Sequence, residues 1–162
     1  MRFLPIVLTL CCGSASAQVL STDGNAKIQS PVSAQDSVKI PIQRLFDGMR
    51  RSDTAMIRSA FAPGAILQTV LQNRAGDTRV VTEPIDSFLA GMARPHTEVY
   101  DERISYDDLR IDGPLASAWT PYQFFVGEKF SHCGVNAFHL VRFAGEWKIQ
   151  YIIDTRRRTG CK

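Results

Sequence analysis

The C-terminal third of the chain contains the pattern that most constrains its fold, two alternating strands joined by a very short turn. The segments CGVNAFHLVRF and EWKIQYIID place large apolar residues at every second position, and Ala144-Gly145 lies between them. Alternation with a period of two is typical of strands that bury one face, and a two-residue connection is typical of a hairpin. The chain therefore ends in an antiparallel hairpin whose apolar face must be covered by the rest of the domain.

The register of this hairpin decides which side chains face the core. A turn at Ala144-Gly145 directs inward the residues Asn136, Phe138 and Leu140, opposite Ile153, Tyr151 and Ile149. A shift by one residue would instead expose Phe138 and Leu140, and burial of a phenylalanine or leucine is worth about 1.5–3 kcal/mol. We therefore expect the first register, in which His139 and Asp154 face outward.

The N-terminus has the pattern of a signal peptide. It begins with one arginine, continues with an apolar run over residues 3–12 and reaches Ala15-Ser16-Ala17, an A-x-A cleavage site. The apolar run is shorter than the roughly 20 residues that span a bilayer. We predict that residues 1–17 are cleaved after Ala17 and that the mature protein is periplasmic or secreted, without a membrane span.

The mature chain is predicted to be one domain behind a short leader. Residues 18–33 contain few large apolar side chains and are predicted to be flexible, and residues 34–162 are predicted to form the domain. Loss of Arg2 with the signal peptide changes the formal charge from +3 to +2. A charge this small does not indicate a nucleic-acid partner, and the arginine-rich end TRRRTGCK is expected to be a solvated tail.

Cleavage leaves Cys133 and Cys161 as the remaining cysteines. In an oxidising compartment two such cysteines are expected to form a disulfide. The adjacent residues His132 and Cys133 point to opposite faces of a strand, and a zinc site needs three or four ligands. We therefore expect neither a metal site nor a nucleophilic Cys–His pair.

The remainder of the chain predicts helices first and strands afterwards. Helical spacing of apolar residues extends over 34–51, with regular helix starting at Pro41, and over 52–64 and 83–93. Strands are predicted at AILQTVLQ and DTRVVT, and throughout the chain after Pro95. The expected fold is α+β, with helices on one face of a strongly curved antiparallel sheet and a hollow between the layers, where ligands commonly bind.

Several polar and aromatic side chains are candidates for this hollow. On one strand His132 and Asn136 share the inward parity, and a histidine can serve as an acid, a base or a hydrogen-bond partner near neutral pH. It can equally be a structural residue at the strand end. The predicted ligand-binding residues are Trp119, Tyr122, His132, Asn136 and Tyr151.

The run AWTPYQFFVGEKFSHCGVNAFHLV, followed by EWKIQYIIDTRRRTGC, resembles exported bacterial proteins of the lumazine-binding, SnoaL-like branch of the nuclear transport factor 2 (NTF2)-like superfamily. The resemblance extends over about residues 36–161. It implies a cone-shaped roll with a pocket between the helices and the bent sheet, and a homodimer formed through the outer sheet face. Relatives include cyclases, isomerases, epoxide hydrolases and proteins without a known reaction, so it implies no single activity.

Two functions are consistent with these observations. The first is an exported binding protein that holds a small, partly aromatic molecule in the cone, without a cofactor. The second is an isomerase, cyclase or hydrolase in which His132 is the general acid or base. Catalytic relatives place a carboxylate inside the cone, and the sequence places none beside His132, so we favour binding.

Overall fold

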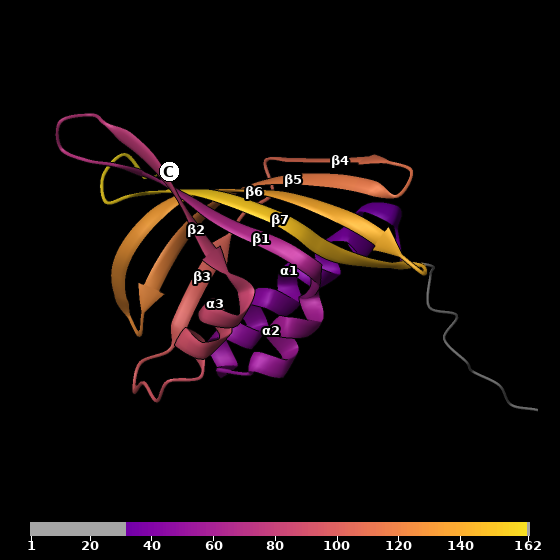
Figure 1. Cartoon of the computed structure of the whole chain (residues 1–162), viewed down its shortest axis with the longest axis horizontal. Coiled ribbons are helices and arrows are strands. Elements are labelled where there is room, and N and C mark those ends of the chain that lie inside the picture. The colour runs from indigo at the N-terminus through magenta and orange to yellow at the C-terminus, as the bar shows by residue number, and fades with distance from the viewer. Residues whose placement is uncertain (1–31, 162) are drawn as a thin grey trace, which may run out of the picture. The chain divides into compact units, whose positions relative to one another are not determined.

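The computed structural model describes residues 32–161 (Figure 1), and the predicted signal peptide and most of the predicted leader lie outside these residues. Within this described part, three helices precede or interrupt seven strands. The helices are α1 (Ala34–Arg51), α2 (Thr54–Ala60) and α3 (Ile85–Met92). The strands are β1 (Phe61–Gln72), β2 (Thr78–Pro84), β3 (Tyr100–Ile104), β4 (Asp108–Asp112), β5 (Leu115–Val126), β6 (Lys129–Phe143) and β7 (Glu146–Arg157).

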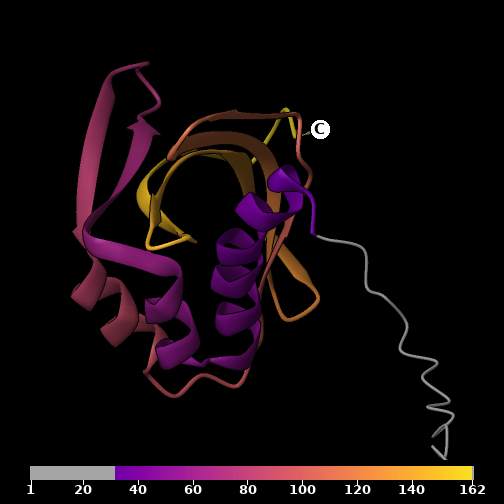
Figure 2. The ribbon, with the colours of Figure 1, turned by 90° about the vertical axis from the view of Figure 1, so that its right-hand side faces the viewer.

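The strands form one curved, open sheet with the order β2-β1-β7-β6-β5-β3, and β4 also pairs with β5. Figure 1 shows the helices on one side of this sheet, and Figure 2 shows β5, β6 and β7 curling over α1. The predicted α+β class and the layering are confirmed. The sheet is not purely antiparallel, because β7 inserts between β1 and β6 and runs parallel to β1.

The helix boundaries differ from the predicted ones at two prolines. Ser33 caps α1, since its Oγ accepts a hydrogen bond from the backbone N–H of Asp36 at 3.0 Å, and the helix begins at Ala34 instead of Pro41. The cap and the burial of Val38 and Ile42 on either side of Pro41 together offset the hydrogen bond that this proline cannot donate. The predicted second helix ends early, because β1 starts at Phe61 and passes through the Pro63-Gly64 sequence.

The core lies between α1 and the inner face of the central strands. The ring of Phe46 contacts that of Phe138 edge-on, with ring centres 6.2 Å apart. Phe138 and Leu140 are almost fully buried, as the predicted register requires. The buried α1 residues that pack there are Val38, Ile42, Leu45, Phe46 and Met49.

The turn of the last hairpin forms as predicted, since Phe143 pairs with Glu146 across Ala144-Gly145. Leu140 pairs with Ile149, also as predicted. The register then shifts by one residue between His139 and Leu140, which leaves Gln150 of β7 without a direct partner. This shift is a β-bulge, in which one extra residue on one strand inverts the facing of every residue beyond it.

The bulge makes the predicted pairs beyond it wrong. Phe138 pairs with Ile152, where Tyr151 was expected, and Asn136 pairs with Asp154, where Ile153 was expected. As a result Ile152 and Asp154 face the helices, while Tyr151 and Ile153 face outward. The bulge thereby places a carboxylate, that of Asp154, on the inner face of the sheet.

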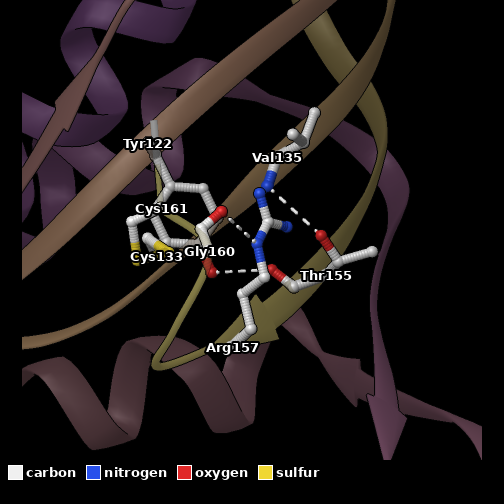
Figure 3. The surroundings of a disulfide bond; sticks show 7 residues. All are labelled: Tyr122, Cys133, Val135, Thr155, Arg157, Gly160 and Cys161. Atoms are coloured by element: carbon white, nitrogen blue, oxygen red, sulfur yellow. Dashed lines mark hydrogen bonds between the residues drawn. A yellow bond between two sulfur atoms is a disulfide. The ribbon is translucent and has the colours of Figure 1, made fainter.

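The disulfide between Cys133 and Cys161 is confirmed, with its Cα atoms 5.9 Å apart. Figure 3 shows it where the segment that follows β7 folds back toward β6, close to Tyr122. The fold-back is also held by Arg157, whose Nε donates to the carbonyl of Gly160 at 3.3 Å. The disulfide therefore attaches the end of the chain to the strand that carries His132 and Asn136.

Candidate ligand-binding cavity

A cavity of about 280 Å³ lies between the helices and the inner face of the sheet. The wall is formed by α1, α3 and six strands, and most of it is apolar and largely aromatic. The apolar residues that line it are Leu45, Phe46, Met49, Phe61, Leu67, Phe88, Met92, Tyr100, Tyr122, Phe124, Phe138 and Ile152. A wall of this kind with few polar groups is typical of a small-molecule site.

The polar residues that line the cavity come from β1, β2, β3, β6 and β7. Strand β6 contributes His132 and Asn136, as predicted from their shared parity. The remaining polar lining residues are Gln68, Thr69, Glu83, Glu102, Asp154 and Arg156. Three carboxylates therefore line the same cavity as His132, and two of them, Glu102 and Asp154, bond the polar residues Asn136 and Arg156; the sequence indicated none there.

Glu102 of β3 is the first of these carboxylates. Its Oε1 accepts a hydrogen bond from Nδ2 of Asn136 at 2.7 Å. Burial raises the pKa of Glu102 to about 7; the bond from Asn136 and the charge of Arg156 oppose this rise, and the nearby carboxylate of Asp154 adds to it. Glu102 therefore exchanges a proton near neutral pH.

Sequence reasoning missed Glu102 because β3 alternates weakly. Its neighbours Asp101 and Arg103 bond each other at 2.7 Å, and Asp101 also bonds Arg50 of α1 at 3.2 Å. The available signal was the parity of Tyr100 and Ile104, both of which pack against the core. Glu102 lies midway between them and shares their face.

Asp154 of β7 is the second carboxylate, and it is buried, with 7% of its surface exposed. The prediction that it faces outward is wrong, because the bulge at Gln150 turns it inward. Its Oδ2 accepts hydrogen bonds from Nε of Arg156 at 2.9 Å and from the hydroxyl of Tyr122 at 3.0 Å. Asp154 is therefore paired and hydrogen-bonded, as a buried charge must be.

The hydroxyl of Tyr122 is used within the protein. It is directed at Asp154 and also at the backbone carbonyl of Thr155, 3.0 Å away, so two acceptors share one hydrogen. Burial and the charges of Asp154 and Glu102 raise the pKa of this phenol. Tyr122 lines the cavity as predicted, and its polar atom holds Asp154 in place.

Gly134 creates the space through which Tyr122 reaches β7. Tyr122 of β5 lies opposite Gly134 of β6, whose other neighbour is Arg156. A Cβ at Gly134 would lie 1.7 Å from the carbonyl oxygen of Thr155 and 2.7 Å from Cε1 of Tyr122. A glycine inside a strand is typical of such a close approach.

His132 lies on the cavity wall between two aromatic rings. Its ring centre is 4.9 Å from that of Phe124 and 5.7 Å from that of Tyr122, and its Nδ1 is 3.0 Å from Oγ of Ser131. Burial lowers the pKa of His132, and the positive charge of Arg156 lowers it further. The imidazole is therefore neutral at neutral pH.

Two of the predicted ligand-binding residues do not line the cavity. Trp119 pairs with Ala137 on the opposite face of the sheet and is 50% exposed. Tyr151 stacks on His139 with ring centres 5.9 Å apart, and its hydroxyl donates to Oε1 of Gln68 at 2.6 Å. Only Tyr122, His132 and Asn136 of the predicted set reach the cavity.

The raised pKa of Glu102 predicts how stability depends on pH. The folded protein holds this proton more tightly than the unfolded chain, so its stabilising effect is present at low pH and is lost as pH rises through the window from 4.5 to about 7. Because one pKa unit corresponds to about 1.4 kcal/mol, Glu102→Gln should become more stable than the wild type by up to about 3 kcal/mol at pH 8.

Urea unfolding of both proteins between pH 4.5 and pH 8 measures this difference. The matched control is Glu128→Gln, which removes an exposed carboxylate in the β5–β6 turn. A constant difference between Glu102→Gln and the wild type over this range would show that Glu102 titrates like an exposed carboxyl.

Across residues 32–161, no three histidine, cysteine or acidic side chains gather as metal ligands. The same part of the chain contains no helix that is long and apolar enough to cross a membrane.

A family model described as "Putative lumazine-binding" matches residues 33–151 of this chain. None of the curated proteins matches it significantly. The matched segment includes α1 and most of the sheet, with Glu102, His132 and Asn136, and it ends just before Asp154.

Solved structures share the fold at low sequence identity. A conserved protein from Planctomyces limnophilus matches with a TM-score of 0.62 and 16% identity, over 75% of this chain and 94% of that one. An NTF2-like protein of unknown function from Shewanella baltica has a TM-score of 0.57 and 15% identity, over 76% and 93%. A cystatin-like domain of unknown function from Nostoc punctiforme has a TM-score of 0.58 and 13% identity, over 80% and 82%.

Proposed function

The chain belongs to the family described as "Putative lumazine-binding", in the NTF2-like superfamily, and from this premise we propose that its cavity binds a small ligand with an apolar, partly aromatic body. The observation that carries the proposal is the cavity itself, about 280 Å³ of space with aromatic walls and a cluster of polar side chains. Ligand sites in proteins combine these properties and start at about 300 Å³. A bound ring would pack on the aromatic wall, while the polar groups would fix its orientation.

The polar cluster is well prepared for this role. Its side chains are already hydrogen-bonded to one another, since Asn136 donates to Glu102 and Arg156 donates to Asp154. A site whose side chains are fixed before binding loses less conformational entropy when the ligand enters. This arrangement supports a site in which hydrogen-bonding groups that are already fixed in position bind one edge of a small molecule.

Calorimetric titration with lumazine and with 1-naphthalenemethanol tests the proposal, since both are small ring systems. We expect saturable binding of at least one probe to the wild type. Leu67→Trp fills part of the cavity from β1 and should weaken that binding at least tenfold, because Leu67 lines the wall.

The control is Leu115→Trp, an equally large change at a half-exposed position of β5 outside the cavity. It should bind like the wild type. Absence of saturable binding, or equal binding by both variants, would contradict the proposed function.

A second candidate function is proton transfer to or from a bound substrate, and the specific observation that favours it is the state of Glu102. A carboxyl with a pKa near 7 can act as an acid or a base at neutral pH, whereas an ordinary glutamate is a weak base. In this account Glu102 exchanges the proton with the substrate, and Asn136 orients the carboxyl group of Glu102. Neutral His132 is a second proton acceptor. Binding remains the first proposal, since it needs the cavity alone.

Export and dimerisation stay predictions. The predicted cleavage site at Ala17 lies outside the described residues. For a homodimer, the outer face of β5, β6 and β7 offers apolar and aromatic side chains, namely Trp119, Val135, Ala137, Tyr151 and Ile153. We propose that the mature protein is periplasmic or secreted and that two copies of it form a homodimer through this face.

A further inference from the structure

We propose that the natural ligand of the cavity is a small organic cation, an amine or amidine whose charged nitrogen binds beside Glu102 while its apolar body packs on the aromatic wall. The inference rests on the proposed binding function and specifies the chemical class of the ligand. It is carried by the charges, the unoccupied acceptor atoms and the aromatic rings that surround Glu102.

The charges in the cavity favour a positive guest. The acidic lining residues are Glu83, Glu102 and Asp154, whereas the one cationic lining residue is Arg156, because His132 is neutral. Arg156 is already committed to Asp154 through its Nε. Glu102 feels the carboxylate of Asp154 more strongly than the guanidinium of Arg156, so its surroundings are negative on balance.

Two acceptor oxygens at Glu102 and Asn136 have no donor among the described residues. Asn136 donates to Oε1 of Glu102, and within residues 32–161 no donor bonds the second carboxyl oxygen, Oε2. The amide oxygen of Asn136 likewise has no donor in the described part of the chain. A charged nitrogen that carries several hydrogens would supply the donors that these oxygens lack.

The walls next to Glu102 are aromatic. Tyr100, two residues away on β3, has its ring centre 5.9 Å from that of Phe124, and both rings line the cavity. Phe46 and Phe138 line it from α1 and β6. The faces of such rings attract organic cations, and together with a carboxylate they form a site that an uncharged or anionic guest uses less well.

Binding of a cation should depend on the charge of Glu102. The titratable or charged groups that line the cavity with it are Glu83 on β2, Tyr100 on β3, Tyr122 on β5, His132 on β6, and Asp154 and Arg156 on β7. The α1 and α3 residues that line the cavity carry no charge. Since the pKa of Glu102 is about 7, a guest that stays protonated should bind more tightly as pH rises from 5.5 to 8.

Three probes with the same naphthalene body separate charge from shape: 1-naphthylmethylamine, which is protonated over this range, 1-naphthalenemethanol and 1-naphthoate. Calorimetry at pH 8 should show the amine binding at least tenfold more tightly than the alcohol, and the carboxylate binding most weakly. At pH 5.5 the advantage of the amine over the alcohol should fall about tenfold, because Glu102 is then protonated.

Variants assign the effect to one side chain. Glu102→Gln should reduce the amine-to-alcohol ratio at pH 8 to less than threefold, whereas Glu128→Gln, with the same change in net charge, should keep it. The pH series on the wild type tests the inference independently of whether Glu102→Gln folds.

The outcomes distinguish this inference from the proposed function. Equal binding of the three probes, or an amine preference that survives Glu102→Gln, would overturn the cation assignment and leave the binding function standing. Failure of every probe to bind would contradict both.

Discussion

Gly134→Ala is expected to lower the free energy of unfolding by about 3 kcal/mol or more, the largest loss that we expect from one added methyl group. The new Cβ would be 1.7 Å from the carbonyl oxygen of Thr155, which belongs to the neighbouring strand β7. A backbone atom cannot move away without separating β6 from β7. The ring of Tyr122, at 2.7 Å, would also have to leave Asp154.

Urea unfolding measures this loss, and Gly91→Ala is the matched control. Gly91 lies in α3 with open space around its Cα, so alanine there should stabilise the protein by about 0.5–1 kcal/mol through helix propensity. If Gly134→Ala unfolds at the same urea concentration as the wild type, the carbonyl of Thr155 and the ring of Tyr122 do not lie against Gly134.

Removal of the disulfide should have the second large effect. The double variant Cys133→Ala/Cys161→Ala loses a cross-link between residues separated by 28 positions, and the entropy of closing a loop of that length corresponds to about 3.5 kcal/mol. The comparison is urea unfolding of both proteins with and without a reductant.

The reductant serves as the internal control, because it should destabilise the wild type and leave the double variant unchanged. The effect should also reach the cavity, since Cys133 lies between His132 and Gly134 on β6. Equal stability of the oxidised wild type and the double variant would mean that the cross-link does not constrain the unfolded chain.

The central hairpin could be predicted because two independent constraints agree there. The short turn at Ala144-Gly145 fixes the pairing from Phe143 back to Leu140, and the burial of Phe138 and Leu140 fixes the inner face of β6. The disulfide followed from the predicted signal peptide, whose cleavage would leave Cys133 and Cys161 as the remaining pair. These features depend on local chemistry and on apolar area, and both can be read in a sequence.

The bulge could not be predicted because nothing at Gln150 marks it. Tyr151, Ile152 and Ile153 are three large residues in succession, so either parity buries an apolar side chain. The structure selects the one that places Asp154 next to Tyr122 of β5, a contact that is distant in sequence. Long-range polar contacts of this kind decide a register that local alternation leaves open.

Glu102 was missed for a related reason. Its strand contains the charged run Asp101-Glu102-Arg103, in which no apolar contrast reveals the inward position. Trp119 was assigned to the cavity as a large aromatic residue, although its neighbours Ala118 and Thr120 are the buried ones. In these two strands a charged residue, Glu102, and two small residues, Ala118 and Thr120, face inward. Large apolar residues are usually the ones that are buried.

The central claim is that Glu102 lies inside a ligand-binding cavity, and carbon-detected NMR of its side-chain carboxyl tests that claim most directly. The pKa measured by pH titration should be about 7 in the free protein, and the carboxyl resonance should move when 1-naphthalenemethanol is added. A pKa of 4.5 for Glu102, together with a carboxyl resonance whose chemical shift does not change when the probe is added, would contradict the account.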